Sequence, residues 1–285
     1  MPLGTAQVTL AVANNFIPEL WEGRLYETLR KSLVFGGLCN RNWEQKLLEA
    51  GDRVRITELG PITIRDYVKN STTLTRQTLN TAGQWLDITQ SKYFDFEVDD
   101  IDKAQAAGEI LSDAADLAAY GFADTFDQFV ALLYAQAGSI SAATPINSLN
   151  VYDALLGLGQ ALSDAKVPKI GRWCVIPPWF NRKLSLAEVQ IENIQGEAWA
   201  SGVVGRCAGF DQVFESNNVY ETGGQYKIMA GTNRAMTVAD QINKVEAYRP
   251  EGAFSDAMKG LHVYGGKVVD PACLAVLDAS VLAEP

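Results

Sequence analysis

The chain has 285 residues, of which 47% are hydrophobic and 20% are charged. This balance excludes a disordered or collagen-like chain and allows a sizeable core. Its 24 Lys and Arg against 34 Asp and Glu give a formal charge of −10, which opposes contact with phosphate backbones and excludes a general DNA-binding protein. We expect no targeting segment at the N-terminus and no membrane span, because no apolar run approaches the ~20 residues that cross a bilayer. The cysteines lie far apart in apolar surroundings, which predicts buried, reduced thiols rather than a metal or redox site: Cys39, Cys174, Cys207 and Cys273.

The first predicted element is an amphipathic helix that Asn15 caps and that ends near Gly36-Gly37. Trp21, Leu25 and the leucines that follow recur every four residues and form one apolar stripe. No neighbouring segment offers a partner for this stripe. We therefore expect Trp21 and Leu25 to contact a distant surface or another subunit.

From Arg53 to Val98 the hydrophobic period changes to two. Alternation is seen in four stretches around a polar middle: Arg53–Thr57, Ile62–Arg65, Trp85–Thr89 and Tyr93–Asp99. This pattern predicts a long strand–loop–strand excursion. Isolated two-stranded ribbons are marginally stable in water, so a neighbouring chain is the expected cover for its apolar faces and edges.

A very long helix is predicted next, from about Ile101 to Ala137, on the order of 55 Å in length. Such a rod suits a spine along a flat molecule better than a layer of a compact sphere. Acidic side chains run parallel to its apolar stripe on the opposite side of the helix: Asp113, Asp116, Asp124 and Asp127. The excursion instead carries basic ones: Arg53, Arg55, Arg65 and Lys69. Solvation alone explains either set, and an equally weighted hypothesis is that one subunit's excursion docks on the acidic spine of the next.

The remaining chain mixes one helix with many short strands. The helix is expected over 150–165, and a buried strand over Arg172–Ile176 is halted by Pro177-Pro178. Further strands are expected over 210–214, 226–230, 236–239, 261–264, 268–269 and 274–277. The order of long helix, mixed middle and all-strand end indicates an α+β fold.

Enzyme signals are weak along the whole sequence. His262 is the only histidine, and it has no identifiable nucleophile or carboxylate partner, so a structural strand histidine is the favoured interpretation. Asp95, Glu97, Asp99, Asp100 and Asp102 fit a polar strand face and helix capping better than a calcium loop. Gly202, Gly205 and Gly209 fit backbone turns better than a nucleotide loop. We therefore assign no catalytic, cofactor or metal residues and expect no enzyme; a soluble hydrolase that uses His262 is the alternative.

Several stretches together, in order and spacing, resemble the major capsid (coat) proteins of tailed bacteriophages along essentially the whole chain. They are Asn15–Trp21, Lys92–Ala104, Gly171–Trp173 with Pro177–Phe180, Gly205-Arg206 with Gly209-Phe210, Ala230–Ala235 and Gly260–Gly265.

The resemblance implies the Hong Kong 97-type capsid fold. Its N-terminal arm would be residues 1–50, its extended two-stranded loop 51–98, its peripheral domain with the spine helix 99–145 and 241–285, and its axial domain 146–240. The implied function is a structural subunit that assembles as hexamers and pentamers into an icosahedral shell around double-stranded DNA. The expected location is the virion capsid, assembled in the host cytoplasm.

The implied partners are further copies of the chain, a scaffolding protein, a portal, a possible decoration protein and DNA held without specific binding. We expect no N-terminal scaffolding extension, and no covalent bond from Lys69, because no catalytic Glu or acceptor can be assigned. The charge of −10 would leave packaged DNA free to slide along the wall.

Two alternatives keep a structural role. An encapsulin-like nanocompartment shares the implied fold but encloses cargo enzymes. A tail-tube or decoration protein would form tubes or trimers rather than closed shells.

Overall fold

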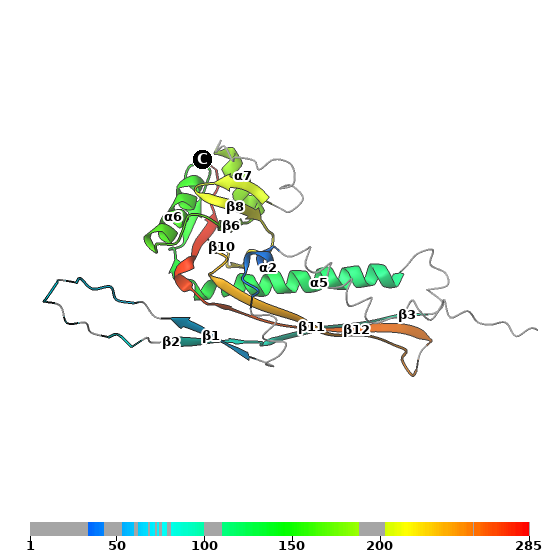
Figure 1. Cartoon of the computed structure of the whole chain (residues 1–285). Helices are drawn as coiled ribbons and strands as arrows, with labels where there is room; N and C mark the ends of the chain where they lie inside the picture. Colours follow the sequence, from blue (N-terminus) through cyan, green and yellow to red (C-terminus); the bar gives the residue numbers. More distant parts are fainter. Residues whose placement is uncertain are drawn as a thin grey trace, which may run out of the picture.

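The fold was analysed in a computed structural model, which describes residues 34–42, 53–59, 62–67, 69–71, 73, 76–78, 81–99, 110–187, 203–252 and 254–284. Figure 1 shows a compact head above a long limb, with a narrow ribbon that projects to one side. The C-terminus lies in the head.

The head is built on an eight-stranded sheet in the order β4-β13-β10-β6-β8-β7, with β5 beside β13 and β9 beside β10. These strands are β4 (Ser139–Ile140), β5 (Thr144–Ile146), β6 (Arg172–Ile176), β7 (Val203–Cys207), β8 (Phe210–Glu215), β9 (Glu221–Thr222), β10 (Gln225–Thr232) and β13 (Leu274–Val281). The head also contains the helices α6 (Val151–Asp164) and α7 (Pro178–Leu186), and the 3-10 turn η4 (Pro271–Cys273) precedes β13. One face of α6 is buried in the main core because its apolar residues recur at helical spacing: Val151, Leu155, Leu158 and Leu162.

The limb pairs one long helix with a three-stranded antiparallel sheet. The helix is α5 (Ile110–Leu132), extended by the 3-10 turn η2 (Leu133–Gln136), and the sheet order is β11 (Met236–Tyr248), β12 (Ser255–Val268), β3 (Gln90–Asp99). Phe122 and three alanines of α5 form a small core with Val245 and Met258 of the sheet. Such small residues allow the helix to lie close to the strands.

The ribbon consists of β1 (Arg53–Leu59) and β2 (Thr81–Asp87), paired from Arg53 opposite Asp87 to Leu59 opposite Thr81. Its base is attached to the limb, since Ile56 and Leu86 are buried against Ala239 of β11. A Cβ atom on Gly265 of β12 would overlap the carbonyl oxygen of Asp87. Only glycine lets the two backbones approach this closely.

A second segment is attached to β11, the strand that also contacts the base of the ribbon. Residues 34–42 contain the single-turn helix α2 (Phe35–Leu38). Asn40 then accepts a hydrogen bond from the Val238 amide (3.1 Å) and donates its own amide to the Met236 carbonyl (2.9 Å). The Arg41 guanidinium lies 2.7 Å from Asp240 Oδ1. The segment is therefore fixed to the first residues of β11.

The predictions for the head and the α+β class hold well. β6 spans the predicted Arg172–Ile176, and α6 differs from the predicted 150–165 by one residue at each end. All four cysteines are buried and free of disulfides. The start predicted for the long helix and most of the N-terminal helix lie outside the described residues; α2 includes Gly36-Gly37, the pair expected to end that first helix.

Several strand predictions were wrong or too short. Residues 62–65 form no strand. The predicted strands 236–239, 261–264 and 268–269 belong to the much longer β11 and β12, because Gly265 and Gly266 make room for neighbouring groups instead of breaking the strand. β7 and α7 were not predicted. Of the three glycines predicted to form turns, Gly209 does lie in one, beside Ala208 with both φ angles positive. Gly205 lies within β7, and Gly202 lies outside the described residues.

The excursion read as one ribbon is divided between two sheets. β1 and β2 pair with each other, while β3 pairs with β12 from Gln90 opposite Tyr264 to Asp99 opposite Ser255. β13, close to the C-terminus, lies in the head beside β10. The four-segment division of the chain stays a prediction.

Candidate subunit interface

Large apolar side chains are exposed in the loop that connects the two strands of the ribbon. Ile62, Ile64 and Tyr67 are 70%, 95% and 68% exposed in the single chain. The Thr63 amide donates a hydrogen bond to Gln77 Oε1 (3.0 Å), which links the two sides of this loop. Full burial of one such side chain is worth about 1.5–3 kcal/mol. The described residues of this loop (62–67, 69–71, 73 and 76–78), which we call the ribbon tip, thus offer apolar area that a partner can cover.

The predicted basic residues of the ribbon are all exposed. Arg53 Nε lies 3.2 Å from Asp87 Oδ1, and its guanidinium lies 5.7 Å from the centre of the Trp85 ring. An exposed pair of this kind contributes about 0–1 kcal/mol. The contact of Arg53, Arg55, Arg65 and Lys69 with a second copy stays a prediction.

The acidic residues of α5 have different surroundings. Asp127 is 3% exposed and accepts a hydrogen bond from the Val34 amide (3.2 Å). Burial raises its pKa to about 6, although backbone hydrogen bonds from residues 34–36 oppose that rise. Asp124 and Asp116 are half-buried, and Asp124 accepts from Gln128 Nε2 (2.8 Å). Asp127 therefore anchors the segment 34–42 of its own chain.

Three predicted contact residues lie outside this description. Trp21 and Leu25 fall outside the described residues, and of Asp113 only the backbone, within α5, is described. Sequence reasoning also missed Leu117 and Tyr120, which are 73% and 64% exposed on α5. The signal was present, because both lie among the aspartates on the side of the helix read as polar.

His262 occupies an aromatic cluster rather than a cleft. It is fully buried, and its ring centre lies 5.2 Å from that of Phe122 and 5.0 Å from that of Tyr264. Within the described part of the chain, neither ring nitrogen has a hydrogen-bond partner. Burial lowers its pKa to about 4, with Asp240 opposing that change and Arg41 adding to it. This geometry lacks the hydrogen-bonded nucleophile that a hydrolase reaction requires, and it fits the structural interpretation.

Other kinds of site find little support in the described ranges. They contain no group of three or more His, Cys, Asp or Glu side chains arranged to hold a metal ion. No helix among them is long and apolar enough to cross a membrane.

The sequence matches no protein-family model and no curated protein. Solved structures do match it. A structure from Mycobacterium phage Che8 is 29% identical with a TM-score of 0.70, covering 86% of this chain and 90% of that one. The capsid structure of cyanophage P-SCSP1u is 18% identical with a TM-score of 0.66, covering 82% and 85%. A virus-like particle from Pyrococcus furiosus is 15% identical with a TM-score of 0.58, covering 91% and 98%.

These similarities extend over most of each chain. The chain therefore has the fold of tailed-phage capsid structures, and the fold predicted from the sequence is confirmed.

Proposed function

We propose that the chain is the major capsid protein of a tailed phage, a structural subunit whose copies build the icosahedral shell around double-stranded DNA. The capsid fold supports this function, and the observation that carries it is the ribbon, anchored at its base and uncovered at its tip. Ile56 and Leu86 are buried at the base, whereas Ile64 at the tip is 95% exposed. A second copy is the natural cover for such a tip.

Cohesion of the shell follows from many repeated contacts. With a charge of −10, copies repel one another at long range, so apolar burial and local charge complementarity must hold them together. Each contact can be weak because multivalency adds their effects. The further partners are a scaffolding protein, a portal, a possible decoration protein and DNA without specific binding, with assembly in the host cytoplasm into hexamers and pentamers.

Expression of the chain alone and with phage partners, followed by negative-stain electron microscopy, tests this function. We expect closed shells from the wild type and few or none from Ile64→Asp, since the added charge cannot be buried in a contact. The control is Thr63→Asp, which places the same charge on a neighbouring polar position. A wild-type protein that stays monomeric under every condition would refute the proposal.

A nanocompartment that encloses protein cargo is the second candidate. The similarity to a virus-like particle from Pyrococcus furiosus supports this alternative, since that structure of similar fold is described as a particle and not as a phage capsid. Purified particles from infected cells distinguish the two functions. Double-stranded DNA inside them supports the phage shell, and an enclosed enzyme supports the nanocompartment.

A further inference from the structure

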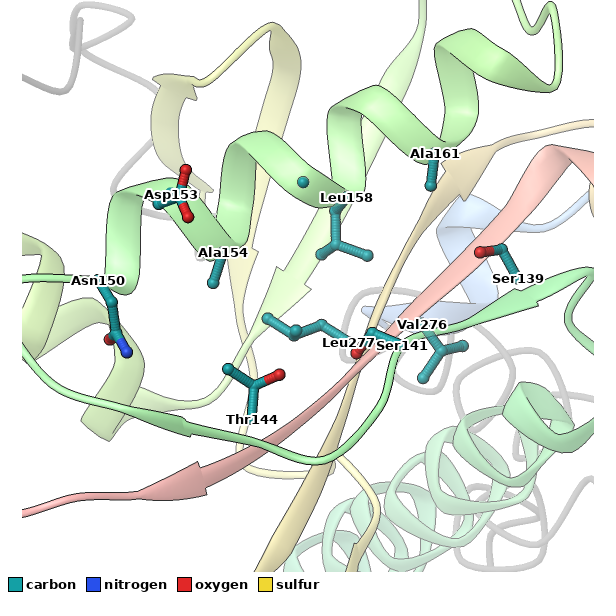
Figure 2. Close-up of a pocket in the computed structure, with 11 residues that line it drawn as sticks. Ser139, Ser141, Thr144, Asn150, Asp153, Ala154, Leu158, Ala161, Val276 and Leu277 are labelled. Carbon is teal, nitrogen blue, oxygen red and sulfur yellow. The ribbon is translucent and has the colours of Figure 1, made fainter.

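A groove of about 340 Å³ runs between α6 and the β4–β13 edge of the head sheet. Figure 2 shows Ala154 and Leu158 pointing from α6 toward the segment opposite, where Leu277 of β13 lies. Gly157 and Ala161 leave space along the helix, and the exposed Asp153 lies at the rim. This α6 groove is large enough to admit an aliphatic side chain. Its lining is mixed, with apolar groups from Ala154, Leu158, Ala161, Val276 and Leu277 beside the polar Ser139, Ser141, Thr144 and Asn150.

The same head exposes an aliphatic side chain elsewhere. Ile170 is 88% exposed in the loop 165–171, directly after Lys169, and both Lys169 and Lys166 of this loop are exposed as well. We call residues 166–170 the Ile170 loop. An isoleucine so fully in water gains about 1.5–3 kcal/mol if another surface buries it.

The Ile170 loop is held firmly in place. The guanidinium of buried Arg172 donates hydrogen bonds to the carbonyls of Val167 (2.6 Å) and Pro168 (3.0 Å). It also donates to the carbonyl of Gly159 in α6 (3.1 Å), and the Gly171 amide donates to Asp211 Oδ2 (2.5 Å). Little entropy remains to be lost when a loop fixed in this way binds a partner.

The groove and the loop lie at different edges of one sheet. The groove borders β4 and β13, whereas Ile170 lies beside Arg206 of β7 and Gln212 of β8, at the other end of the strand order. Two different patches at two edges suit a head-to-tail contact. Contacts of that kind close into rings when each step is a rotation.

We propose that Ile170 of one copy inserts into the α6 groove of the next copy, with Lys169 placed against Asp153. This inference rests on the proposed shell function and specifies one contact by which heads join around a ring. The apolar insertion supplies the affinity. The Lys169–Asp153 pair supplies orientation, because an exposed ion pair adds little energy of its own.

Gly157 provides the sharpest test. A Cβ atom built there meets no other atom within 4 Å, so Gly157→Leu fills the groove without a clash in its own chain. Gly157→Ala is the matched control, since it leaves most of the groove open while both changes favour the helix. We expect the critical concentration for shell assembly to rise about tenfold or more in Gly157→Leu and to stay at the wild-type value in Gly157→Ala. The unfolding midpoint of both variants should be no lower than that of the wild type.

A charge exchange tests the orientation. Asp153→Lys and Lys169→Glu should each slow assembly, and the double variant should recover it toward the wild-type rate. The contact is refuted if Gly157→Leu and Ile170→Asp assemble like the wild type, or if the double variant is no better than the singles. Each variant is compared with wild-type protein that forms shells under the same conditions. If the wild type forms no shells, that result refutes the proposed function and not this contact.

Discussion

Asp127→Asn tests the attachment of residues 34–42 to the spine helix. The substitution keeps the size of the side chain and an oxygen that can accept the Val34 amide, which lies 3.2 Å from Asp127 Oδ2. It removes a charge from a side chain that is only 3% exposed. The variant therefore separates the hydrogen bond from the cost of the buried charge.

The size and sign of the effect follow from the pKa of Asp127. Burial raises this pKa from 3.8 to about 6 in the folded chain, so the folded state binds the proton more tightly than the unfolded state. The resulting stabilisation is complete below pH 3.8 and is lost as the pH rises through about 6. Between pH 5 and pH 7.5 the wild type should lose about 1.4 kcal/mol relative to Asp127→Asn, which cannot titrate.

The assay is urea unfolding followed by tryptophan fluorescence, at concentrations where light scattering detects no shells. Asp127→Ala is measured in parallel. It lacks both the charge and the acceptor, and it should be less stable than Asp127→Asn by about 1 kcal/mol at both pH values. A difference between wild type and Asp127→Asn that is equal at pH 5 and pH 7.5, or that changes in the opposite direction, would refute the reasoning.

Three further substitutions test other parts of the molecule. Arg55→Glu should reduce shell yield in a light-scattering assay while the unfolding midpoint is unchanged; a normal yield would reject the docking of the ribbon on an acidic partner. His262→Phe should remove an acid-labile group, because the stabilisation from neutral His262 is present above pH 6.5 and is lost as the pH falls toward about 4. Urea unfolding should therefore show the wild type losing about 2 kcal/mol relative to His262→Phe between pH 7.5 and pH 5, and equal losses would contradict the pKa. Lys183→Met should lower the free energy of unfolding by about 2–4 kcal/mol, since the ammonium donates to the Ile146 (2.9 Å) and Leu282 (2.6 Å) carbonyls; the exposed Lys166→Met is the control, and similar losses in both would reject this reason.

The sequence predicted those elements whose pattern is local. β6 and α6 were located to within a residue because a continuous apolar run and a helical stripe end at clear proline or cap signals. β11 and β12 were underestimated because the close approach that requires Gly265 involves Asp87, far away in the sequence. Pro177-Pro178 ends a strand and also begins α7, because a proline fits the first helical turn, where its missing N–H would have no partner in the helix.

The candidate interface was harder to predict, because a sequence pattern identifies an apolar side chain but not whether its own chain covers it. Asp127 and Asp124 belong to one acidic stripe in the sequence, yet the first is buried and the second is half-buried. The difference arises because residues 34–42 fold back onto one end of the helix. Ile170 carried no signal at all, since its exposure depends on hydrogen bonds that Arg172 makes to the loop before it.

The two segments predicted to reach other copies are attached to one short stretch of β11. The backbone of Asn40 forms hydrogen bonds with Met236 and Val238, and the Arg41 side chain forms an ion pair with Asp240. Between those positions, Ala239 packs against the buried base of the ribbon. Because a close-packed core transmits strain rather than absorbing it, a shift of this stretch must move both attachments together. A contact made by one segment can thus bias the position of the other, which gives the subunit a physical route for coupling successive steps of assembly.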